Sequence, residues 1–407
     1  MKVIVYPHSL GIGGSQINAV DCAAAVRDTG HDVAVFGTPG PLVDRIKALG
    51  LPFVAAPIPR RRPDLRVMRA LLALARDQRA DLVHAYEWPP ALEAYYGPRL
   101  QAGIPVLFTI MSMAVAPFLP GSMPLVVGTR QVERRTAARH RGPVALLEPP
   151  VDTVGDHPGV DPAGFRRDHG LRAGERVVVI VSRLAVELKL EGLERSIAAV
   201  GRLARDRPVR LVIVGDGEAA GRLAGLAAEV NDRLGHRAVV LTGALLDPRP
   251  AYAAADVVVG MGGSILRGLA FGKPAVVLGE RGFSEVLTPA SIDRFMWQGF
   301  YGVGDGDLRP DRLCKQLAGL LADEALLREL GRFSREVVCS RYSLQAAGQR
   351  LDALYQAAVD VPVSSPRLAG EAVVAGAWVA AYKAWRRLRR LRGAVATDDF
   401  NARAAAR

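Results

Sequence analysis

Short runs of β-branched and other apolar residues recur along the chain, and a small-residue turn and a helix-length segment follow most of them. Such runs occupy Lys2–Pro7, Val177–Val181, Leu211–Val214 and Val257–Val259. A continuous apolar run of this length predicts a strand that is buried on both faces, as in parallel sheets covered by helices. Because these strands alternate with helical segments, we expect an α/β fold built on doubly wound parallel sheets.

The length and one proline-rich break predict how the chain divides. At 407 residues it exceeds the size at which one core usually suffices, so two domains are expected. Two prolines in Glu148–Asp152 fit neither a helix nor a strand, and the α/β rhythm restarts after them. We therefore expect an N-terminal Rossmann-like domain at residues 1–150, a second one at 151–360, and a tail at 361–407.

The tail predicts one basic amphipathic helix over Arg367–Arg392, with disorder from Asp398 onward. Six cations and no acid lie between Lys383 and Arg392. Two interpretations remain open: an interfacial helix attracted to anionic lipid, or a helix that packs its tryptophans on the protein's own surface. The helical spacing predicts an apolar face of Val374, Trp378, Ala381, Trp385 and Leu388, opposite a basic face of Lys383, Arg386, Arg387 and Arg390.

The formal net charge of +12 comes almost entirely from arginine. Since the sequence has no zinc-finger spacing and no aromatic-plus-basic RNA-binding signature, we expect no nucleic-acid partner. Anionic substrates or an anionic membrane surface are the better candidates. A second basic group, Arg60, Arg61 and Arg62, fits docking to an acidic membrane or a polyprenyl-phosphate acceptor; the alternative is a solvated face.

The compartment and the metal content follow from what the sequence lacks. The three cysteines have neither disulfide nor metal-site spacing, and no apolar run reaches the roughly 18 residues of a membrane span. The N-terminus begins a strand and has no signal-peptide pattern. We expect a cytoplasmic protein without a metal site, peripheral at the inner face of the plasma membrane if the basic segments bind lipid.

Two glycine turns follow predicted strands and precede predicted helices. One is Gly260–Ser264, and the other contains Gly13 and Gly14. A strand, a glycine turn and a helix N-terminus together expose backbone N–H groups to an anion, and glycine lets a phosphate approach the backbone. The alternative is a tight turn that only allows close helix packing.

The order of the motifs resembles that of a family 4 glycosyltransferase with the GT-B fold, over about Met1–Tyr355. The matching features, in chain order, are Gly13-Gly14, Arg183 with Lys189, Gly215-Asp216-Gly217, Tyr252–Asp256 leading into Gly262-Gly263, and Leu269–Pro274.

The resemblance implies two Rossmann-like domains that face a cleft. It implies a nucleotide-diphosphate sugar donor held mainly by the C-terminal half and an acceptor held mainly by the N-terminal half. Transfer would retain the anomeric configuration, with no obligatory metal or other cofactor. Arg183 and Lys189 match the family's pair that stabilises the leaving diphosphate, a role suited to a forked guanidinium and a compact ammonium. The alternative is two ordinary surface cations, one of them paired with Glu187.

The resemblance also assigns further candidate residues. In the N-terminal half, His8 and His84 end predicted strands and could approach the cleft, and Tyr86 stands where relatives have a second histidine. Met111 stands where a histidine that touches the donor sugar is common. The donor-binding candidates are Gly13, Gly14, Gly262, Gly263, Ser264, Leu245 near the base, and Glu285 at a position where relatives have a glutamate.

The chain departs from the family's two glutamates, which lie eight positions apart. The alignment places Val259 at the first glutamate and Arg267 at the second. Valine cannot accept a hydrogen bond from a sugar hydroxyl, and arginine only donates. Arg267 would instead reach a phosphate or a carboxylate on the sugar or the acceptor.

Three functions are therefore weighed. The first is a glycosyltransferase that acts on a cell-envelope glycan or a lipid-linked acceptor. The second is a catalytically weak relative that binds nucleotide or glycan as an assembly partner, suggested by the missing glutamates. The third, a sugar-phosphate epimerase, would need paired carboxylates in the cleft, and the sequence offers no convincing pair.

Overall fold

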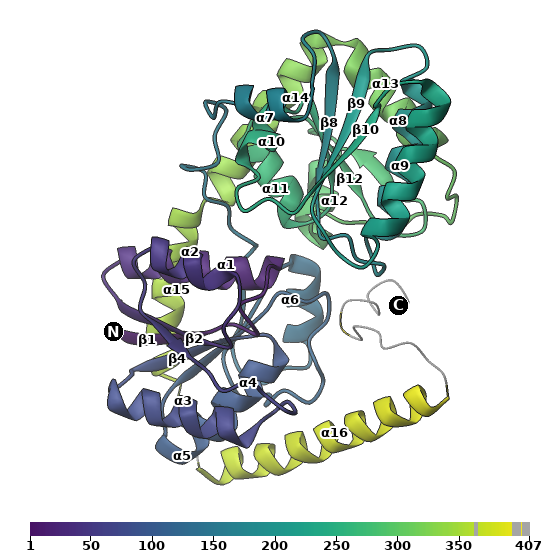
Figure 1. The fold of residues 1–407 in the computed structure, drawn as a ribbon. Helices are drawn as coiled ribbons and strands as arrows, with labels where there is room; N and C mark the ends of the chain where they lie inside the picture. Colours follow the sequence, from purple (N-terminus) through teal and green to yellow (C-terminus); the bar gives the residue numbers. More distant parts are fainter. Residues whose placement is uncertain (362–364, 393–399, 401–407) are drawn as a thin grey trace. The chain divides into compact units, whose positions relative to one another are not determined.

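The computed structural model describes residues 1–361, 365–392 and 400. These residues form two units, each built on a largely parallel sheet with helices on both faces (Figure 1). The first unit contains residues 1–150 and the chain from Leu344 onward, and the second is Val151–Ser343. The predicted α/β class with two Rossmann-like units and a helical tail is confirmed.

The first unit contains a seven-stranded sheet with the order β3-β2-β1-β4-β5-β6-β7, and every neighbouring pair is parallel. Its strands are β1 (Lys2–Tyr6), β2 (Asp32–Gly37), β3 (Phe53–Ala55), β4 (Leu82–Tyr86), β5 (Val106–Ile110), β6 (Leu125–Val127) and β7 (Val144–Leu146). Its helices are α1 (Gly14–Asp28), α2 (Leu42–Ala48), α3 (Leu65–Asp77), α4 (Trp88–Ala94), the π-helix η1 (Tyr95–Arg99), α5 (Leu100–Ala102), α6 (Arg130–Ala137), α15 (Leu344–Val359) and α16 (Ser365–Leu391).

Side chains of β1 alternate between the two faces of this sheet, so both faces need cover. Val3 and Val5 are buried with residues of α1, α2 and α15. Ile4 and Tyr6 are buried with residues of α3 and α4 on the other face. Figure 1 shows these two helical layers above and below the strands of the first unit. The continuous apolar strands follow from this double burial.

The second unit repeats the plan with a six-stranded sheet, order β10-β9-β8-β11-β12-β13, in which only the edge strand β13 is antiparallel. Its strands are β8 (Arg176–Val181), β9 (Val209–Val214), β10 (Val239–Gly243), β11 (Val257–Gly260), β12 (Ala275–Leu278) and β13 (Ser284–Val286). Its helices are α7 (Ala163–Asp168), α8 (Leu190–Leu203), α9 (Ala220–Leu234), α10 (Arg249–Ala254), α11 (Gly263–Ala270), α12 (Ile292–Gln298), α13 (Asp311–Ala322) and α14 (Glu324–Arg341). Apolar residues from α8, α9 and α13 cover one face, and those from α10, α11 and α12 the other.

The structure corrects the expected domain membership of residues 344–360. Helix α15 belongs to the first unit, where Ala347, Leu351 and Tyr355 are buried against α1 and the central strands. Gly348 lies against the carbonyl of Ala25, and a Cβ there would come within 2.8 Å of that oxygen. An amphipathic helix predicts that it packs on a sheet but not on which one, so position along the chain was a poor guide here.

Helix α16 packs on the first unit through a different face from the predicted apolar one. Leu368, Glu371, Ala375 and Val379 are buried, whereas Trp378 of the predicted apolar face is 54% exposed. The Glu371 carboxylate accepts hydrogen bonds from the backbone and hydroxyl of Ser122 and pairs with an arginine of the same unit. The disorder expected from Asp398 onward falls, apart from residue 400, outside the described residues.

Candidate functional site

The carboxyl ends of β8 and β11 meet at the switch point of the second sheet, where the strand order reverses. Loops that leave such a point diverge, and doubly wound sheets bind their ligands there. Arg183 and Lys189 lie in the loop after β8, and Gly262 and Gly263 lie in the turn after β11. The structure therefore brings the expected diphosphate residues and the expected glycine turn to one edge of one sheet.

Arg183 and Lys189 form no ion pair with any carboxylate of the described residues, and the expected alternative of a Lys189–Glu187 pair is absent there. Only the backbone N–H of Lys189 donates to the carbonyl of Glu187, at 2.8 Å. Burial and the neighbouring Arg183 lower the pKa of Lys189 to about 8. Leu188 just before it has φ +66°, an uncommon conformation for a residue with a Cβ. Two neighbouring cations, one of them desolvated, make a local positive charge that favours the binding of an anion.

The Gly215-Asp216-Gly217 turn supports the loop that carries Arg183. A Cβ at Gly215 would lie 1.8 Å from the carbonyl oxygen of Ser182, and one at Gly217 would lie 2.4 Å from that of Leu184. The backbone N–H of Leu184 donates to the carbonyl of Asp216 at 2.9 Å. Glycine is therefore required here because two backbone segments approach closely, rather than by a phosphate.

The turn before α11 leaves open space in front of the helix N-terminus. Gly262 has φ +62°, and no heavy atom lies within 4 Å of a Cβ built at Gly262 or Gly263. The N–H of Gly262 already donates to the carbonyl of Phe300 at 2.6 Å, and the hydroxyl of Ser264 donates to Met261 at 3.0 Å. The first-turn N–H groups of Gly263 and Ser264 are thus the ones placed to meet an anion.

Arg267 is engaged by a carboxylate of its own unit. Its Nε and Nη2 donate to the two oxygens of Asp156, both at 2.8 Å, and its guanidinium lies 5.7 Å from the centre of the Tyr252 ring. Asp156 is 3% exposed. The expectation that Arg267 reaches a substrate phosphate or carboxylate therefore meets a competing partner, because a forked pair already satisfies two of its donor groups.

The missing first glutamate has a simple structural reason. Val259, eight positions before Arg267, lies inside β11 and is fully buried, so a side chain at that position points into the core. Glu285 lies in β13 and pairs with Arg294. Leu245 is half-buried in the loop after β10, beside Leu246, which is 95% exposed.

The switch point of the first sheet lies between β1 and β4. His8 follows β1 and is half-exposed, and Gly13 and Gly14 open α1 just beyond it. Glu87, which directly follows β4, also lies here, and sequence reasoning missed it. Its carboxylate accepts hydrogen bonds from the loops on either side. The sequence around Glu87 matches no known motif. The one available signal was a carboxylate directly after a predicted strand.

His84 and Tyr86 are not cleft residues, and that interpretation was wrong. Strand β4 continues to Tyr86, so His84 lies in the middle of the strand and is fully buried. Its ring nitrogens contact the hydroxyls of Tyr355 at 2.8 Å and Thr109 at 2.6 Å. Burial lowers the pKa of His84 to about 3, so the ring is neutral. The strand's end had been placed two residues too early.

Arg62 is likewise not part of a surface basic patch. It pairs with the fully buried Glu93 at 3.3 Å and donates to the carbonyl of His8 at 2.8 Å. Glu93 also accepts a hydrogen bond from Tyr6, and burial raises the pKa of Glu93. A buried carboxylate 31 positions away thus binds this guanidinium, so only Arg60 and Arg61 of the triplet remain exposed.

The remaining basic residues meet on one part of the first unit. Arg61 lies close enough to Lys383 of α16 to help burial lower the pKa of that lysine. Arg387 and Arg390 are exposed, whereas Arg386 lies over the Tyr382 ring at 5.8 Å. No helix in the described part of the chain has both the length and the apolarity to span a bilayer. In that same part, no group of three or more His, Cys, Asp or Glu side chains forms a metal site.

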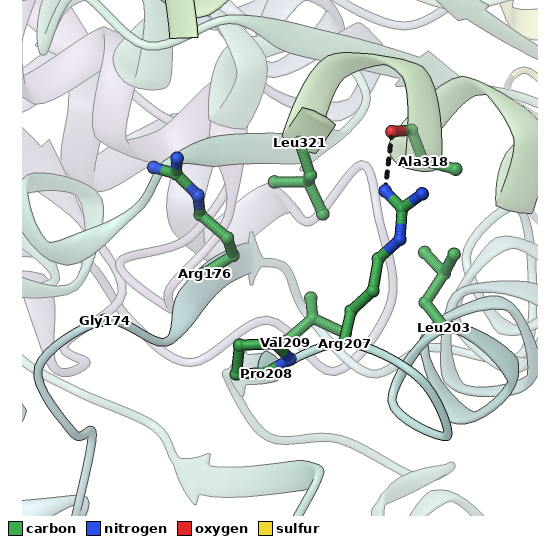
Figure 2. A pocket seen from close by; sticks show the side chains of 8 residues that line it. All are labelled: Gly174, Arg176, Leu203, Arg207, Pro208, Val209, Ala318 and Leu321. Carbon is green, nitrogen blue, oxygen red and sulfur yellow. Dashed lines mark hydrogen bonds between the residues drawn. The ribbon is translucent and has the colours of Figure 1, made fainter. Parts of the chain in front are cut away.

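One pocket of the second unit lies at the wrong end of the sheet for catalysis. Figure 2 shows that Arg176, Arg207, Leu203 and Leu321 line it, near the amino ends of β8 and β9. Arg176 pairs with Asp256 and Glu324, and Arg207 donates to the carbonyl of Ala318 at 3.2 Å. Both cations are therefore already bound, and ligands of doubly wound sheets bind at the opposite edge.

Two family models match the chain. "Glycosyl transferase 4-like domain" matches residues 13–163, and "Glycosyl transferases group 1" matches residues 175–323. Together they span more than half of the chain, and the second match contains both strands of the second switch point. The chain belongs to the family 4 glycosyltransferases of the GT-B fold, and it is an enzyme of that class. Among curated protein sequences, none matches it.

Solved structures share the fold at low identity. A glycosyltransferase from Rickettsia africae ESF-5 aligns with TM-score 0.70 and 13% identity, over 89% of this chain and 99% of that one. Anabaena Alr3699/HepE in complex with UDP aligns with TM-score 0.68 and 16% identity, over 88% and 100%. A putative UDP-N-acetylglucosamine 2-epimerase from Listeria monocytogenes also aligns, with TM-score 0.63 and 14% identity, over 88% and 96%. Since epimerase and transferase share the fold, the family models decide between them.

Proposed function

We propose that this enzyme transfers a sugar from a nucleoside-diphosphate sugar whose diphosphate is bound by Arg183 and Lys189. The observation that carries the proposal is the pair of adjacent cations at the second switch point, without a carboxylate partner among the described residues. A leaving nucleoside diphosphate gains negative charge as the bond from the anomeric carbon to oxygen breaks. Fixed cations that await this charge lower the barrier, and a desolvated lysine interacts more strongly than one in water.

The proposed transfer uses no metal and retains the anomeric configuration. The acceptor hydroxyl attacks from the face that the phosphate leaves, and its proton passes to the departing phosphate oxygen. The side-chain cations then carry the charge stabilisation that a metal would otherwise supply. The N–H groups of Gly263 and Ser264 add a second anion contact, at the N-terminus of α11. Structures of HepE contain UDP and UDP-glucose, which supports a uridine donor for this chain as well.

The test of donor binding uses the full chain with UDP, GDP, UDP-glucose and GDP-mannose. We expect one nucleotide to raise the melting temperature and its sugar to be released slowly into water. Arg183→Ala and Lys189→Ala should abolish both effects, whereas substitution of Arg205, an exposed arginine in the turn after α8, by alanine should change neither. Nucleotide binding without release from any donor would favour the second candidate, a weak relative that binds nucleotide as an assembly partner. If no nucleotide changed the melting temperature, both the transferase and the nucleotide-binding candidate would be refuted.

We further propose a lipid-linked or envelope-glycan acceptor, reached at the inner face of the plasma membrane. The outer side of α16 exposes Val374 (58%), Trp378 (54%) and Leu388 (54%), beside the exposed cations Arg387 and Arg390. Exposed apolar side chains next to basic ones are typical of a helix that lies on anionic lipid.

The loop before α3 extends this surface. Ile58 (73% exposed) and Leu65 (65% exposed) flank Arg60 and Arg61, and the charge of Arg61 contributes to the lowered pKa of Lys383 of α16. Like charges brought together in this way favour an anionic partner. The loop and the helix therefore support one docking surface on the first unit.

Membrane docking is tested by sedimentation with phosphatidylglycerol vesicles and, as the neutral comparison, phosphatidylcholine vesicles. Deleting α16 would uncover the core beneath Leu368 and Val379, so point substitutions are the better probes. We expect binding to the anionic vesicles only, weakened by Arg387→Glu with Arg390→Glu and by Trp378→Ser, and unchanged by Arg205→Glu. Equal sedimentation of all variants would refute this surface.

A further inference from the structure

Glu87 has the most strained backbone conformation at the first switch point. It follows β4 directly and has φ +67° and ψ +165°. This region is populated almost only by glycine, because a Cβ clashes with the backbone there. Non-glycine residues persist in it only where the surrounding structure holds them, and such residues cluster at functional sites.

The carboxylate of Glu87 joins the loops that follow three neighbouring strands. One oxygen accepts from the hydroxyl of Ser15 and from the backbone N–H of Met111, each at 3.0 Å. The other accepts from the hydroxyl of Ser112 at 2.8 Å. Ser15 lies in the first turn of α1, and Met111 and Ser112 follow β5. Hydrogen bonds to an ionised carboxylate are stronger than neutral ones, so these contacts offset the backbone strain.

Glycine would adopt the backbone conformation of Glu87 without strain but would leave these loops unconnected. Ser15 directly follows Gly13 and Gly14, so a fixed Ser15 also fixes where the glycine loop lies. Met111 follows β5, whose carboxyl end lies at the same edge of the parallel sheet as those of β1 and β4, and doubly wound sheets bind their ligands at this edge. Glu87 therefore holds in one arrangement the two loops through which the first unit is expected to contact the substrate.

We propose that Glu87 is a positioning residue, which holds the glycine loop after β1 and the loop after β5 in their substrate-binding arrangement. The expected effect of Glu87 on turnover rests on the proposed function. The expected effect on the order of the two loops is independent of that function. Nucleotide binding in the second unit should not depend on Glu87.

The experiment compares the full chain with Glu87→Gly, Glu87→Gln and Arg79→Gly. Arg79 is the matched control: it is also a non-glycine residue at positive φ (+51°) in the first unit, but it precedes β4 at the opposite edge of the sheet. Four quantities are measured: the melting temperature, hydrogen exchange of residues 13–16 and 111–113, the rate of hydrolysis of UDP-glucose or GDP-mannose, and the affinity for UDP or GDP.

For Glu87→Gly we expect a melting temperature close to that of the wild type, because relief of the backbone strain and loss of the hydrogen bonds oppose each other. We expect exchange at Met111 and in the glycine loop at least about tenfold faster, since charge-assisted hydrogen bonds are lost. Hydrolysis should fall about tenfold or more while nucleotide affinity stays within about twofold. Glu87→Gln, which keeps an acceptor oxygen, should lie between these values, and Arg79→Gly should change only the melting temperature.

Unchanged exchange in these two loops, or a wild-type rate of hydrolysis by Glu87→Gly, would overturn the inference. A wild-type chain that neither binds nor hydrolyses any of these nucleotides would count against the proposed function instead. In that case the exchange measurement still decides whether Glu87 positions the loops.

Discussion

The two switch points of this enzyme have the same topology and opposite electrostatics. In the second unit, Arg183 and Lys189 lie side by side with no carboxylate partner in the described chain, and the N-terminus of α11 adds further positive potential. In the first unit, the polar groups satisfy one another: Glu87 binds two loops, and Glu93 binds Arg62 and Tyr6. The second unit is thus built to receive charge, and the first is built to hold its own loops still.

This difference fits the proposal that the two units bind two different substrates. An anion needs donors that the protein leaves unsatisfied, and their mutual repulsion is tolerated until the ligand arrives. A neutral hydroxyl acceptor needs loops at fixed positions, which internal hydrogen bonds supply. Substitutions of Arg183, Lys189, Arg267 and His84 test whether each residue meets a ligand or stabilises the protein's own structure.

The largest effect is expected at Arg183 and Lys189. Under the proposed function, replacing either with alanine removes a cation that would stabilise the leaving diphosphate, so kcat for donor hydrolysis should fall on the order of 10²- to 10³-fold. Thermal stability should not fall, since neither side chain has an ion pair to lose in the described structure. A loss of stability without a loss of kcat would make these cations structural and would erase the contrast between the units.

Arg267 should behave in the opposite way. Its pairing with Asp156 predicts a structural role, so Arg267→Ala should lower the free energy of unfolding by roughly 3 kcal/mol because it strands a buried carboxylate. Asp156→Ala should cost less, about 2 kcal/mol, since the Arg267 guanidinium is partly exposed and can be hydrated.

Denaturant titrations of both single variants and the double variant give the pairwise coupling for Arg267 and Asp156. The double variant should lose less free energy of unfolding than the sum of the losses in the two single variants. If Arg267→Ala instead weakened UDP or GDP binding at full stability, the guanidinium would belong with Arg183 as a phosphate contact.

Sequence periodicity predicted the sheets and turns because burial on both faces forces continuous apolar strands. The motif order placed Arg183 and Gly262 correctly after neighbouring strands, since chain order alone fixes which strand each follows. The predictions that were wrong concerned residues whose environment depends on contacts with distant parts of the chain. The sequence predicts Arg62 to be a surface cation because its partner, the buried Glu93, is 31 positions away. The positive φ of Glu87 could not be predicted, because no glycine or other characteristic residue type occupies that position. The prediction that His84 lies at a strand end was wrong, because an error of two residues in the strand's end moves a side chain from the edge of the sheet into the core.

His84 tests whether the first switch point contains a titrating catalytic group. Its folded pKa of about 3 lies below the ordinary histidine value, so the unfolded chain takes up a proton first as the pH falls. Stability should therefore be fully present above about pH 6.5 and decline below it, by about 2 kcal/mol at pH 5.

The measurement for His84 is the free energy of unfolding at several pH values. His84→Gln should flatten the pH dependence and leave kcat unchanged within about twofold, while the exposed His236→Gln should alter neither quantity. A fall in kcat at full stability would return His84 to the active site.

The smallest effect concerns the protonation of Lys189. In the free enzyme its pKa is about 8, because burial and Arg183 disfavour the charged form. A bound diphosphate favours that form and raises the pKa, so nucleotide binding takes up a proton above pH 8. Affinity for UDP or GDP should be constant below about pH 7 and weaken by about tenfold per pH unit above pH 8, until the pKa of the complex is reached.

Titration calorimetry in two buffers of different ionisation enthalpy would detect the proton uptake that accompanies nucleotide binding. Lys189→Arg keeps the charge throughout this range, so its affinity should not change with pH, whereas Arg183→Lys should keep the wild-type slope at lower affinity. A wild-type affinity that stays constant up to pH 10 would show that Lys189 does not meet the diphosphate. The lowered pKa of Lys189 would then need an explanation within the protein itself.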